Sequence, residues 1–516
     1  MKKIKKEFRL HPALLFFCLT ILIMIVSSIG GILHLETSYY TVNSVTGNLE
    51  SKIVVINNLF NRSGIQYLIS NMISNFTSFA PLGNLIVGLL GVGVAYKSGY
   101  LNSLFGLLSK KISKKTFTFI VVLLGILSSM FFEVGYVILI PVAAILFMNL
   151  GRHPSTGVCA AFAGITFGYG ANIIVNGLDS MLSSYTGLAA SILDKTYKVN
   201  LSGNLIFMVI STICIAYLGM IVTEKYIVPK LGRYVFDESE YFDAMIVTKK
   251  EKKGVFIALL SSLLFVLILI YSIIPGLPFS GLFLYLKDSL YVDQLFGDNS
   301  YFSQGVVFLF SLLLIISGLV YGLRVKTFKN NKDLVDAMSY YLKDVASILV
   351  LIFFASQFCA IFKQTNIGVF IVSSLTELLN SIEVSGILLV ILFFIITMIS
   401  TMFIPASSTK WAILSPVVVP MFMQSSLTPE FAQAVFRAAD SAVKGISPLF
   451  TYFVIFLGFL QIYNKKKDNA VTLTDAVSLM MPYAIFYSIL WFVIILAFYI
   501  IGIPIGIGTG VMLPTA

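Results

Sequence analysis

Charged residues are scarce in this sequence of 516 residues. Only 11% are charged, whereas 58% are hydrophobic, and a typical soluble domain carries about 25% charged residues. The mean hydropathy is +0.94. Apolar runs of about 20 residues recur from end to end, and each is long enough to cross about 30 Å of hydrocarbon. The sequence therefore predicts an all-α polytopic membrane protein. It excludes an outer-membrane barrel, whose strands alternate in segments of about 10 residues.

Residues that bind redox metals are also scarce. The chain has three histidines, and its four cysteines lie in apolar stretches without metal-ligand spacing, as buried packing residues do: Cys18, Cys159, Cys214 and Cys359. Haem and redox-metal chemistry therefore lacks ligands, and we expect no cofactor. A membrane enzyme is disfavoured because no paired intramembrane carboxylates accompany a nucleophile. The net charge of +11 is not a nucleic-acid signal, since no such motif is present.

The basic residues instead gather between apolar runs, which is the positive-inside pattern of membrane proteins. The clusters occupy residues 2–9, 110–115, 152–153, 249–253, 324–332 and 465–467. They predict a cytoplasmic N-terminus, an external C-terminus and nine crossings, at about 12–33, 80–98, 155–190, 203–223, 254–274, 305–323, 345–363, 429–461 and 478–501. Two further apolar stretches, 117–150 and 385–425, enter and leave on one side and are predicted re-entrant hairpins.

A shift of 279 positions superposes the two hairpins. Ser128 and Ser129 then fall on Ser407 and Ser408, and Pro141 falls on Pro420. The first hairpin enters from the cytoplasm and the second from outside, which is the inverted-topology repeat of secondary transporters.

The predicted organisation is an N-terminal helix and loop (1–63), a first repeat (64–200, hairpin 117–150, broken helix 155–190), connecting helices (201–332), a second repeat (333–463, hairpin 385–425, broken helix 429–461) and a C-terminal helix and tail (464–516).

The repeats contain two crossings that the sequence predicts to be broken. Glycine and asparagine weaken the helix in GYGANIIVNGLD (168–179), and Pro448 does so in the second repeat. Broken helices present free carbonyls to a cation and positive N-termini to an anion. We therefore expect two hairpin tips and two breaks to converge on a site for a carboxylate substrate and a coupling cation.

Two residues of the first break are candidate Na⁺ ligands, Asn172 and Asp179. Helix capping is the structural alternative for Asn172, and a solvated cap near the external interface is the alternative for Asp179. A charge inside a crossing costs at least about 2.5 kcal/mol, so such a residue is a functional hypothesis by default. Further ion-coupling candidates lie at the hairpin tips, namely Ser128, Ser129, Glu133, Ser407 and Thr409.

Arg437 and Asp440 are candidate substrate residues because their i, i+3 spacing places them on one helix face. The structural alternative is an ion pair between them that allows both to be buried. A free Arg437 is suited to gripping a carboxylate with two hydrogen bonds. Trp411, one of two tryptophans, is placed to stack on an aromatic ring. Its alternative is an anchor at the membrane interface, and Lys410 beside it is suited to snorkelling.

Several stretches resemble the AbgT family of p-aminobenzoyl-glutamate transporters, within the ion-transporter superfamily. They are FAPLGNLIVGLLGVGVAYKSG (79–99), EVGYVILIPVAAILFMNLGRHP (133–154), AFAGITFGYGANIIVNGLDSML (161–182), SSTKWAILSPVVVPMFM (407–423), TPEFAQAVFRAADS (428–441) and GIPIGIG (502–508). The resemblance implies a homodimer with nine crossings and two inverted hairpins per subunit. It implies substrate-binding roles for Asp179, Ser408, Trp411, Pro429, Arg437 and Asp440. Tyr96, Glu133 and GYGAN depart from the family pattern of an acid, an aspartate and GF-x-AN.

The sequence thus predicts a transporter of p-aminobenzoyl-glutamate or related aromatic acids in the cytoplasmic membrane, driven by a Na⁺ or H⁺ gradient. The alternatives are an efflux pump for sulfonamide-type drugs in the same family and a sodium-coupled dicarboxylate transporter. The absence of SNT triplets at the hairpin tips argues against the latter. A channel is a different class, which would carry fluxes independent of a coupled gradient.

Overall fold

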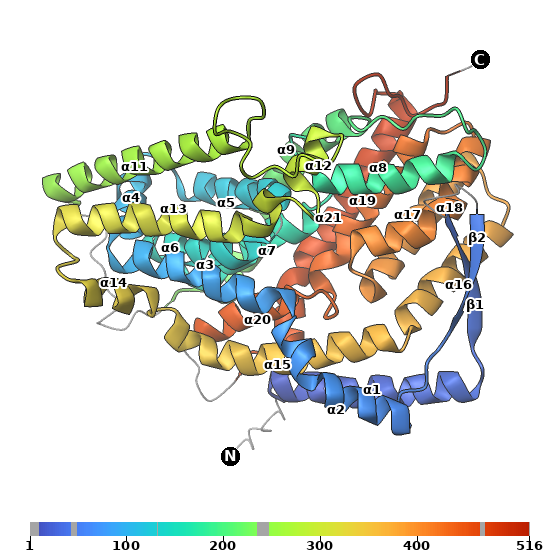
Figure 1. The fold of residues 1–516 in the computed structure, drawn as a ribbon, viewed down its shortest axis with the longest axis horizontal. Coiled ribbons are helices and arrows are strands. Elements are labelled where there is room, and N and C mark those ends of the chain that lie inside the picture. The colour runs from blue at the N-terminus through green and yellow to red at the C-terminus, as the bar shows by residue number, and fades with distance from the viewer. Residues whose placement is uncertain (1–9, 43–48, 132, 235–246, 465–469, 515–516) are drawn as a thin grey trace.

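The computed structural model describes residues 10–42, 49–131, 133–234, 247–464 and 470–514 (Figure 1). The basic clusters at 2–9 and 465–467 lie outside these residues. Helices form nearly all of the regular structure, as predicted. The N-terminal half contains α1 (Pro12–Ile32), α2 (Arg62–Thr77), α3 (Ala80–Lys97), α4 (Tyr100–Ser109), α5 (Lys114–Ser128), α6 (Ile140–Asn149), α7 (Pro154–Phe167), α8 (Gly177–Ala190), α9 (Leu205–Val222) and α10 (Val228–Leu231).

The remaining helices extend from residue 249 to residue 501. They are α11 (Lys249–Ile273), α12 (Tyr291–Phe296), α13 (Tyr301–Val325), α14 (Asn331–Met338), α15 (Leu342–Gln364), α16 (Ile367–Ser381), α17 (Gly386–Phe403), α18 (Ser407–Gln424), α19 (Pro429–Val443), α20 (Phe453–Ile462) and α21 (Leu473–Ile501). Short 3₁₀ or π turns connect several of them, at Ser129–Phe131 (η1), Gly135–Leu139 (η2), Thr223–Ile227 (η3) and Lys444–Ile446 (η5).

In the described part of the chain, nine helical segments are long and apolar enough to cross a membrane. They are Pro12–Ile32, Arg62–Lys97, Lys114–Phe131, Leu205–Leu231, Lys249–Ile273, Tyr301–Val325, Val345–Gln364, Gly386–Phe403 and Leu473–Ile501. Seven of them match predicted crossings. The other two, Lys114–Phe131 and Gly386–Phe403, are first arms of the predicted hairpins, while both predicted broken crossings consist of shorter helices. The number of membrane-length helices equals the predicted number of crossings, but the two sets differ. The broken crossings are not among the membrane-length helices because neither contains a single helix of spanning length.

The segment predicted as the first hairpin folds back on itself. After α6, Arg152 donates to Thr118 near the start of α5 over 3.2 Å and pairs with Glu224 at 2.6 Å. Both ends of the segment therefore lie together, and its turn is formed by η1 and η2. Both arms pack on α7. Such a fold-back is what a re-entrant hairpin requires, while its depth in a membrane stays a prediction.

The second predicted hairpin also folds back. It consists of α17 and α18, joined by the non-helical residues 404–406. The ring of Phe393 in α17 lies 6.3 Å from Trp411 at the start of α18 and 5.6 Å from Phe422 near its end. The two turns lie near corresponding positions of the proposed repeat. Their opposite orientation in the membrane stays a prediction.

Both predicted breaks lie in non-helical chain. Residues 168–176 separate α7 from α8, and residues 447–452 follow η5 and precede α20. Gly170 in the first break approaches α19 so closely that a Cβ there would lie 2.6 Å from the carbonyl oxygen of Arg437. A glycine is therefore required where the first break packs on the second repeat.

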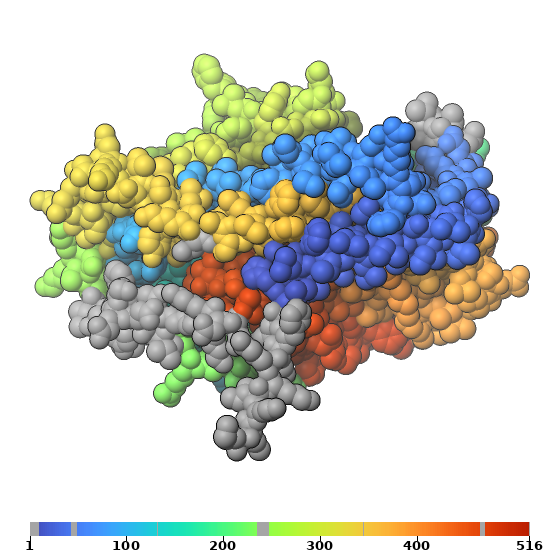
Figure 2. All heavy atoms as spheres, turned by 90° about the horizontal axis from the view of Figure 1, so that it is seen from below, coloured from blue at the N-terminus to red at the C-terminus, as the bar shows by residue number. Residues whose placement is uncertain are grey.

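One element departs from the all-α prediction. Strands β1 (Glu36–Val42) and β2 (Leu49–Val55) form an antiparallel pair in which Glu36 lies opposite Val55. The hairpin packs beside α16 and α18 (Figure 1), and Thr37 donates to Glu377 of α16 over 3.3 Å. On another face of the molecule, α1 and α2 lie beside α15 (Figure 2).

Candidate functional site

A cavity of about 690 Å³ lies where the two hairpin turns and the two helix breaks meet. The first turn contributes Ser129 and Glu133 and the second contributes residues 405–408, while Tyr169 and residues 449–452 come from the breaks. The start of α8 and residues 293, 296–298 complete the wall. The convergence predicted for these four segments is therefore present. The volume is within the usual range for small-molecule sites, about 300–1,000 Å³.

Asp440 of α19 holds two lysines beside this cavity. Its Oδ1 accepts from Lys410 Nζ over 2.5 Å, and its Oδ2 lies 3.0 Å from Lys444 Nζ. Ser407 donates to Oδ2 over 2.5 Å, and Thr401 donates to Oδ1 over 3.2 Å. Both carboxylate oxygens are thus fully engaged, and Asp440 organises the contact between α17, α18 and α19.

The charges of this cluster do not cancel. Lys410, Lys444 and Asp440 are each 2% exposed or less, and two lysines against one aspartate leave one positive charge. Lys410 is enclosed, whereas Lys444 lines the cavity and lies 3.7 Å from the ring centre of Tyr169. Buried charges require compensation. The excess positive charge of this cluster faces the cavity at Lys444, and the same cavity is also lined by the acids Glu133, Asp293 and Asp298. An anionic group in the cavity would supply that compensation.

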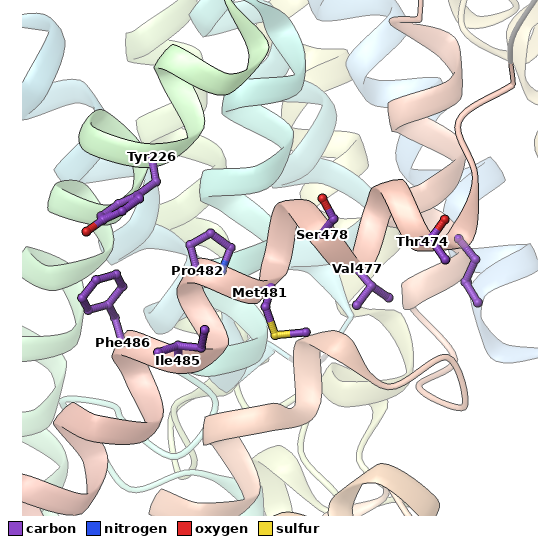
Figure 3. A pocket seen from close by; sticks show the side chains of 9 residues that line it. Tyr226, Thr474, Val477, Ser478, Met481, Pro482, Ile485 and Phe486 are labelled. Carbon is purple, nitrogen blue, oxygen red and sulfur yellow. The ribbon is translucent and has the colours of Figure 1, made fainter. Parts of the chain in front are cut away.

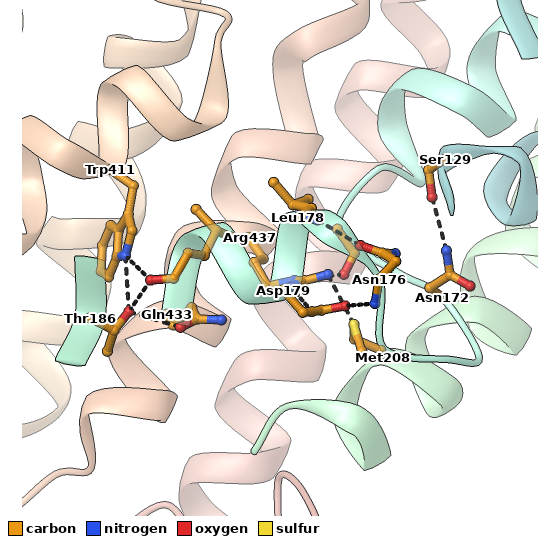
Figure 4. Close-up of polar contacts among 12 residues, drawn as sticks. Ser129, Asn172, Asn176, Leu178, Asp179, Thr186, Met208, Trp411, Gln433 and Arg437 are labelled. Atoms are coloured by element: carbon orange, nitrogen blue, oxygen red, sulfur yellow. Dashed lines mark hydrogen bonds and ion pairs between the residues drawn. The ribbon is translucent and has the colours of Figure 1, made fainter. Parts of the chain in front are cut away.

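Arg437 has a different partner, Asp179 (Figure 4). Its guanidinium pairs with Asp179 Oδ1 and donates to the carbonyl oxygen of Gly170 over 3.2 Å and to Met208 Sδ over 2.9 Å. Asp179 Oδ2 accepts from the backbone of Asn176 over 2.8 Å. The alternative that Arg437 and Asp440 pair with each other is wrong, because each faces a different segment. The alternative of a solvated Asp179 is also wrong, since its side chain is 1% exposed.

The residue that caps α8 is Asn176, not Asn172. Asn176 and Asp179 form a capping box at the start of α8. Asn172 is buried in the break and donates to Ser129 Oγ over 3.1 Å, while its own oxygen accepts from the backbone of Ile173 over 2.8 Å (Figure 4). Asn172 therefore ties the first break to the first hairpin turn, next to the cavity.

Trp411 is enclosed and does not line the cavity. Its Nε1 donates to Thr186 Oγ1 over 3.0 Å and to the carbonyl oxygen of Leu182 over 3.2 Å (Figure 4). Its ring packs 4.6 Å from Phe436 and is 0% exposed. An anchor at the membrane interface is thus wrong for Trp411. In this conformation the side chain fixes α18 to α8.

Aromatic rings do line the cavity elsewhere. Tyr136 and Tyr452 stack with ring centres 4.5 Å apart, and Phe450 lies 5.5 Å from Tyr136. Tyr169 lies on the same cavity wall. These four rings come from the first hairpin and from both breaks. They form an aromatic wall that a flat ligand ring can contact.

The other predicted site residues are dispersed. Ser407 and Ser408 line the cavity. Ser128 bonds the carbonyl of Gly125 in its own helix, Thr409 is exposed, and Pro429 is buried in the first turn of α19; none of these three lines the cavity. Tyr96, the first departure from the family pattern, lies far along α3 against Tyr340 with ring centres 5.6 Å apart.

Sequence reasoning missed Lys410, Lys444 and the aromatic wall as site residues. Two lysines within predicted membrane segments were a usable signal, because an intramembrane cation needs a partner. The tyrosines gave none, since aromatic residues form 14% of the chain. The described residues contain no group of three or more histidine, cysteine or acidic side chains that could hold a metal.

A second cavity, of about 590 Å³, lies on the outer side of α21 (Figure 3). Tyr226 and Phe486 form one end, and Thr474 and Ser478 are among its few polar lining residues. None of the residues that line it is charged. It offers nothing to orient a charged substrate, and the cavity between the hairpins is therefore the candidate site.

Membrane-length helices surround a charged cavity formed by discontinuous helices, which defines the class of this protein as a multi-pass membrane transporter. The sequence profile of the AbgT putative transporter family matches residues 7–513. The chain belongs to this family. Its resemblance to p-aminobenzoyl-glutamate transporters is thereby confirmed, and it is not an enzyme.

Three relatives illustrate the match. The chain is 32% identical over 498 residues to the p-aminobenzoyl-glutamate transport protein of Escherichia coli (strain K12), covering 96% of this chain and 94% of that protein. It is 33% identical to the Neisseria gonorrhoeae MtrF structure, with 98% of each chain covered and a TM-score of 0.50. MtrF is described as illuminating a class of antimetabolite efflux pumps. The Alcanivorax borkumensis YdaH transporter is 30% identical, with 96% and 100% covered and a TM-score of 0.49.

Proposed function

We propose that this protein is a secondary active transporter of p-aminobenzoyl-glutamate or related aromatic acids, coupled to a Na⁺ or H⁺ gradient. The observation that carries the proposal is the cavity between the hairpins, which combines an aromatic wall with Lys444, a member of a cluster of two lysines and one aspartate. The name of the Escherichia coli relative supports the substrate. The meeting of two broken segments supports coupled transport, because discontinuous helices form the ion and substrate sites of such transporters.

The cavity suggests how the substrate binds. A carboxylate of the glutamate part lies beside Lys444 and provides the negative charge that its cluster lacks. The aminobenzoyl ring lies against Tyr136 and Tyr452, where offset or edge contacts stabilise aromatic pairs. Ser408 offers a hydroxyl in the same wall. Ser408, Asp179, Arg437 and Asp440 remain proposed substrate residues, with Asp440 acting through the lysines it holds.

Transport into proteoliposomes tests the proposal. Labelled p-aminobenzoyl-glutamate is given to vesicles with an imposed Na⁺ gradient, an imposed H⁺ gradient, both or neither. We expect accumulation above the external concentration with one of the gradients, and none when both are collapsed. Flux that is unchanged after both gradients are collapsed would contradict the coupling and favour a channel.

Replacing Lys444 tests the anchor itself. Lys444→Gln leaves Lys410 and Asp440 as a neutral pair, so we expect the protein to fold. We expect its KM for p-aminobenzoyl-glutamate to rise by about 10- to 100-fold, since a hydrogen bond to a charged group contributes about 1.5–3 kcal/mol. Lys444→Arg should retain most of the affinity. Lys363→Gln, an exposed change of equal charge on α15, is the control, and an equal rise in its KM would contradict the assignment.

Efflux of sulfonamide-type drugs is the second candidate function, because the MtrF structure is described as that of an antimetabolite efflux pump. Sulfonamides share the aminobenzoyl-like ring but have no carboxylate for Lys444. We therefore expect Lys444→Gln to impair sulfonamide transport less than p-aminobenzoyl-glutamate transport. Flux measured in vesicles of both orientations then gives the direction for each compound.

The coupling ion has candidate ligands beside the cavity. Ser129, Glu133 and Asn172 supply oxygen atoms at the first hairpin turn and the first break, and Ser128, Ser407 and Thr409 remain proposed with them. Asp179 is suited to Na⁺ only if Arg437 leaves, since both of its oxygens are engaged. We further propose a homodimer in the cytoplasmic membrane with a cytoplasmic N-terminus and an external C-terminus, as the charge pattern predicts.

A further inference from the structure

A separate cavity, lined by cations, lies between the N-terminal end of α11 and the C-terminal end of α13. It shares no lining residue with the cavity between the hairpins. Its volume is about 550 Å³, and it is lined by Lys249, Lys252, Lys253, Phe256, Ile257 and Arg324. Four of these six residues are cations, and none is an acid. The two helices lie side by side along their lengths (Figure 1). The cavity therefore combines concentrated positive charge with an apolar floor.

The two helix ends that carry these cations are held together by contacts between α11 and α13. Gly254 packs so closely on α13 that a Cβ there would lie 2.7 Å from Val325 Cγ2. Lys250 donates to the carbonyl oxygen of Val325 over 2.6 Å. These contacts hold Arg324 beside the first turns of α11. The geometry is therefore set by the fold, although the four cationic side chains themselves are exposed.

These cations lack partners among the described residues. None of Lys249, Lys252, Lys253 and Arg324 has an ion pair there. The neighbouring acid, Glu251, is engaged by Thr248, whose backbone and hydroxyl donate to it over 2.7 and 2.8 Å. Four cations in one cavity, without an acidic partner in the described part of the chain, favour a ligand with at least one negative charge.

Below the cations, α11 is unusually exposed. In the most apolar 18-residue stretch of α11, only 17% of the residues are buried inside the protein. The corresponding share is 33% or more in each of the other membrane-length helices of the described chain. Phe256 is 69% exposed, and the stripe continues from it with exposed leucines at positions 260, 263, 264 and 267. Charge at the helix end and apolar surface below it match the two parts of a phospholipid.

We propose that this cavity binds the phosphate headgroup of an anionic phospholipid, with an acyl chain along the exposed stripe of α11. Basic pockets between membrane helices on the cytoplasmic side bind anionic headgroups in this way, and the positive-inside rule assigns this end of the molecule to the cytoplasm. The uncharged groove on α21 (Figure 3) offers no comparable selectivity. The lipid site is separate from the proposed transport site.

Native mass spectrometry of the full-length protein tests the proposal. The purified protein is titrated with phosphatidylglycerol and with phosphatidylcholine of the same acyl chains. We expect tighter binding of phosphatidylglycerol, and a loss of that preference by about tenfold or more in the triple variant Lys252→Gln, Lys253→Gln, Arg324→Gln, since each surface cation contributes about 1 kcal/mol. The charge-conserving variant Lys252→Arg, Lys253→Arg, Arg324→Lys should keep it.

The matched control removes three exposed lysines from a different basic cluster, Lys110→Gln, Lys111→Gln and Lys114→Gln. An equal loss in this control would show a general charge effect and overturn the site. No loss in the first triple variant would do the same. If inorganic phosphate alone binds the lipid-free protein and is lost in the triple variant, the cavity holds a free anion and the lipid assignment is wrong.

Discussion

At the scale of single residues, the buried charges find partners across segments, not along the helix. Arg437 and Asp440 are one turn apart, yet Arg437 pairs with Asp179 of α8 and Asp440 holds Lys410 of α18. The i, i+3 spacing correctly predicts a shared helix (α19) but not a shared contact, because a fully buried helix has neighbours on every side. The partner of each residue therefore decides which double variant is informative.

We predict that Arg437→Met destabilises the protein by about 3–5 kcal/mol, since it leaves Asp179 buried without its partner. Adding Asp179→Asn removes that unpaired charge and should restore most of the stability. Adding Asp440→Asn to Arg437→Met should not, because it also leaves Lys410 and Lys444 uncompensated. The measurement is the thermal unfolding midpoint of each variant in detergent, with flux recorded in parallel.

Flux separates structure from function in these variants. If Arg437→Met with Asp179→Asn recovers stability but not transport, the pair acts in the transport cycle. Recovery of full flux together with stability would leave the pair a purely structural one. Equal stability of the two double variants would contradict the pairing described for Asp179.

The aromatic wall makes a second prediction at this scale. Tyr452→Leu should weaken binding of p-aminobenzoyl-glutamate more than that of free glutamate, by about 1 kcal/mol, which is typical of an aromatic pair. Trp411→Phe should reduce stability, because the indole N–H bonds to Thr186 and Leu182 are lost, and should affect the two ligands equally. Competition binding with both ligands measures the difference.

The reverse result would indicate that Trp411, and not Tyr452, contacts the aromatic ring of the substrate. A selective loss of the aromatic ligand in Trp411→Phe, with Tyr452→Leu unselective, would mean that Trp411 reaches the substrate in another conformation. Phe393→Leu is the matched control, since Phe393 packs on Trp411 and is absent from the cavity wall.

At the scale of elements, the sequence predicts where helices stop better than what lies between them. Glycine at 168 and 170 and proline at 448 end or weaken helices by local chemistry, and the structure is non-helical there. The π-helix at Gly135–Leu139 and the hairpin of β1 and β2 were missed. Strand residues such as ETSYYTV do not alternate clearly, and β1 packs against α16 and α18, which are far away in the sequence.

The two hairpin turns give a prediction for the elements themselves. In a background without the four native cysteines, Cys at Ser129 should react with an impermeant thiol reagent from the cytoplasm, and Cys at Ser408 from outside. Because both positions line one cavity, p-aminobenzoyl-glutamate should protect both from labelling. Labelling of both from one side only, under inward- and outward-favouring conditions alike, would refute the inverted arrangement.

At the scale of the whole molecule, composition alone establishes the class, while the site depends on tertiary contacts. Apolar runs predict the long helices because length and hydropathy are local properties. Ser129, Glu133 and Ser407 are predicted as site residues from their place at the hairpin turns, and all three line the cavity. Lys444 was not predicted, since its proposed role depends on an excess of positive charge summed over three segments.

The sidedness of the molecule is the last property that the charge pattern predicts. The loop at 276–304, with Asp288, Asp293 and Asp298, should lie outside, and the loop at 224–253, rich in lysine, should lie in the cytoplasm.

Alkaline phosphatase folds only where its disulfides form, in the oxidising periplasm. Fusions after Asp288 or at the C-terminus should therefore be active, and a fusion after Arg233 should be inactive although equally expressed. A green fluorescent protein fused at the same three points should give the opposite pattern. Activity after Arg233 would reverse the assigned topology and move the proposed lipid site on α11 to the outer leaflet.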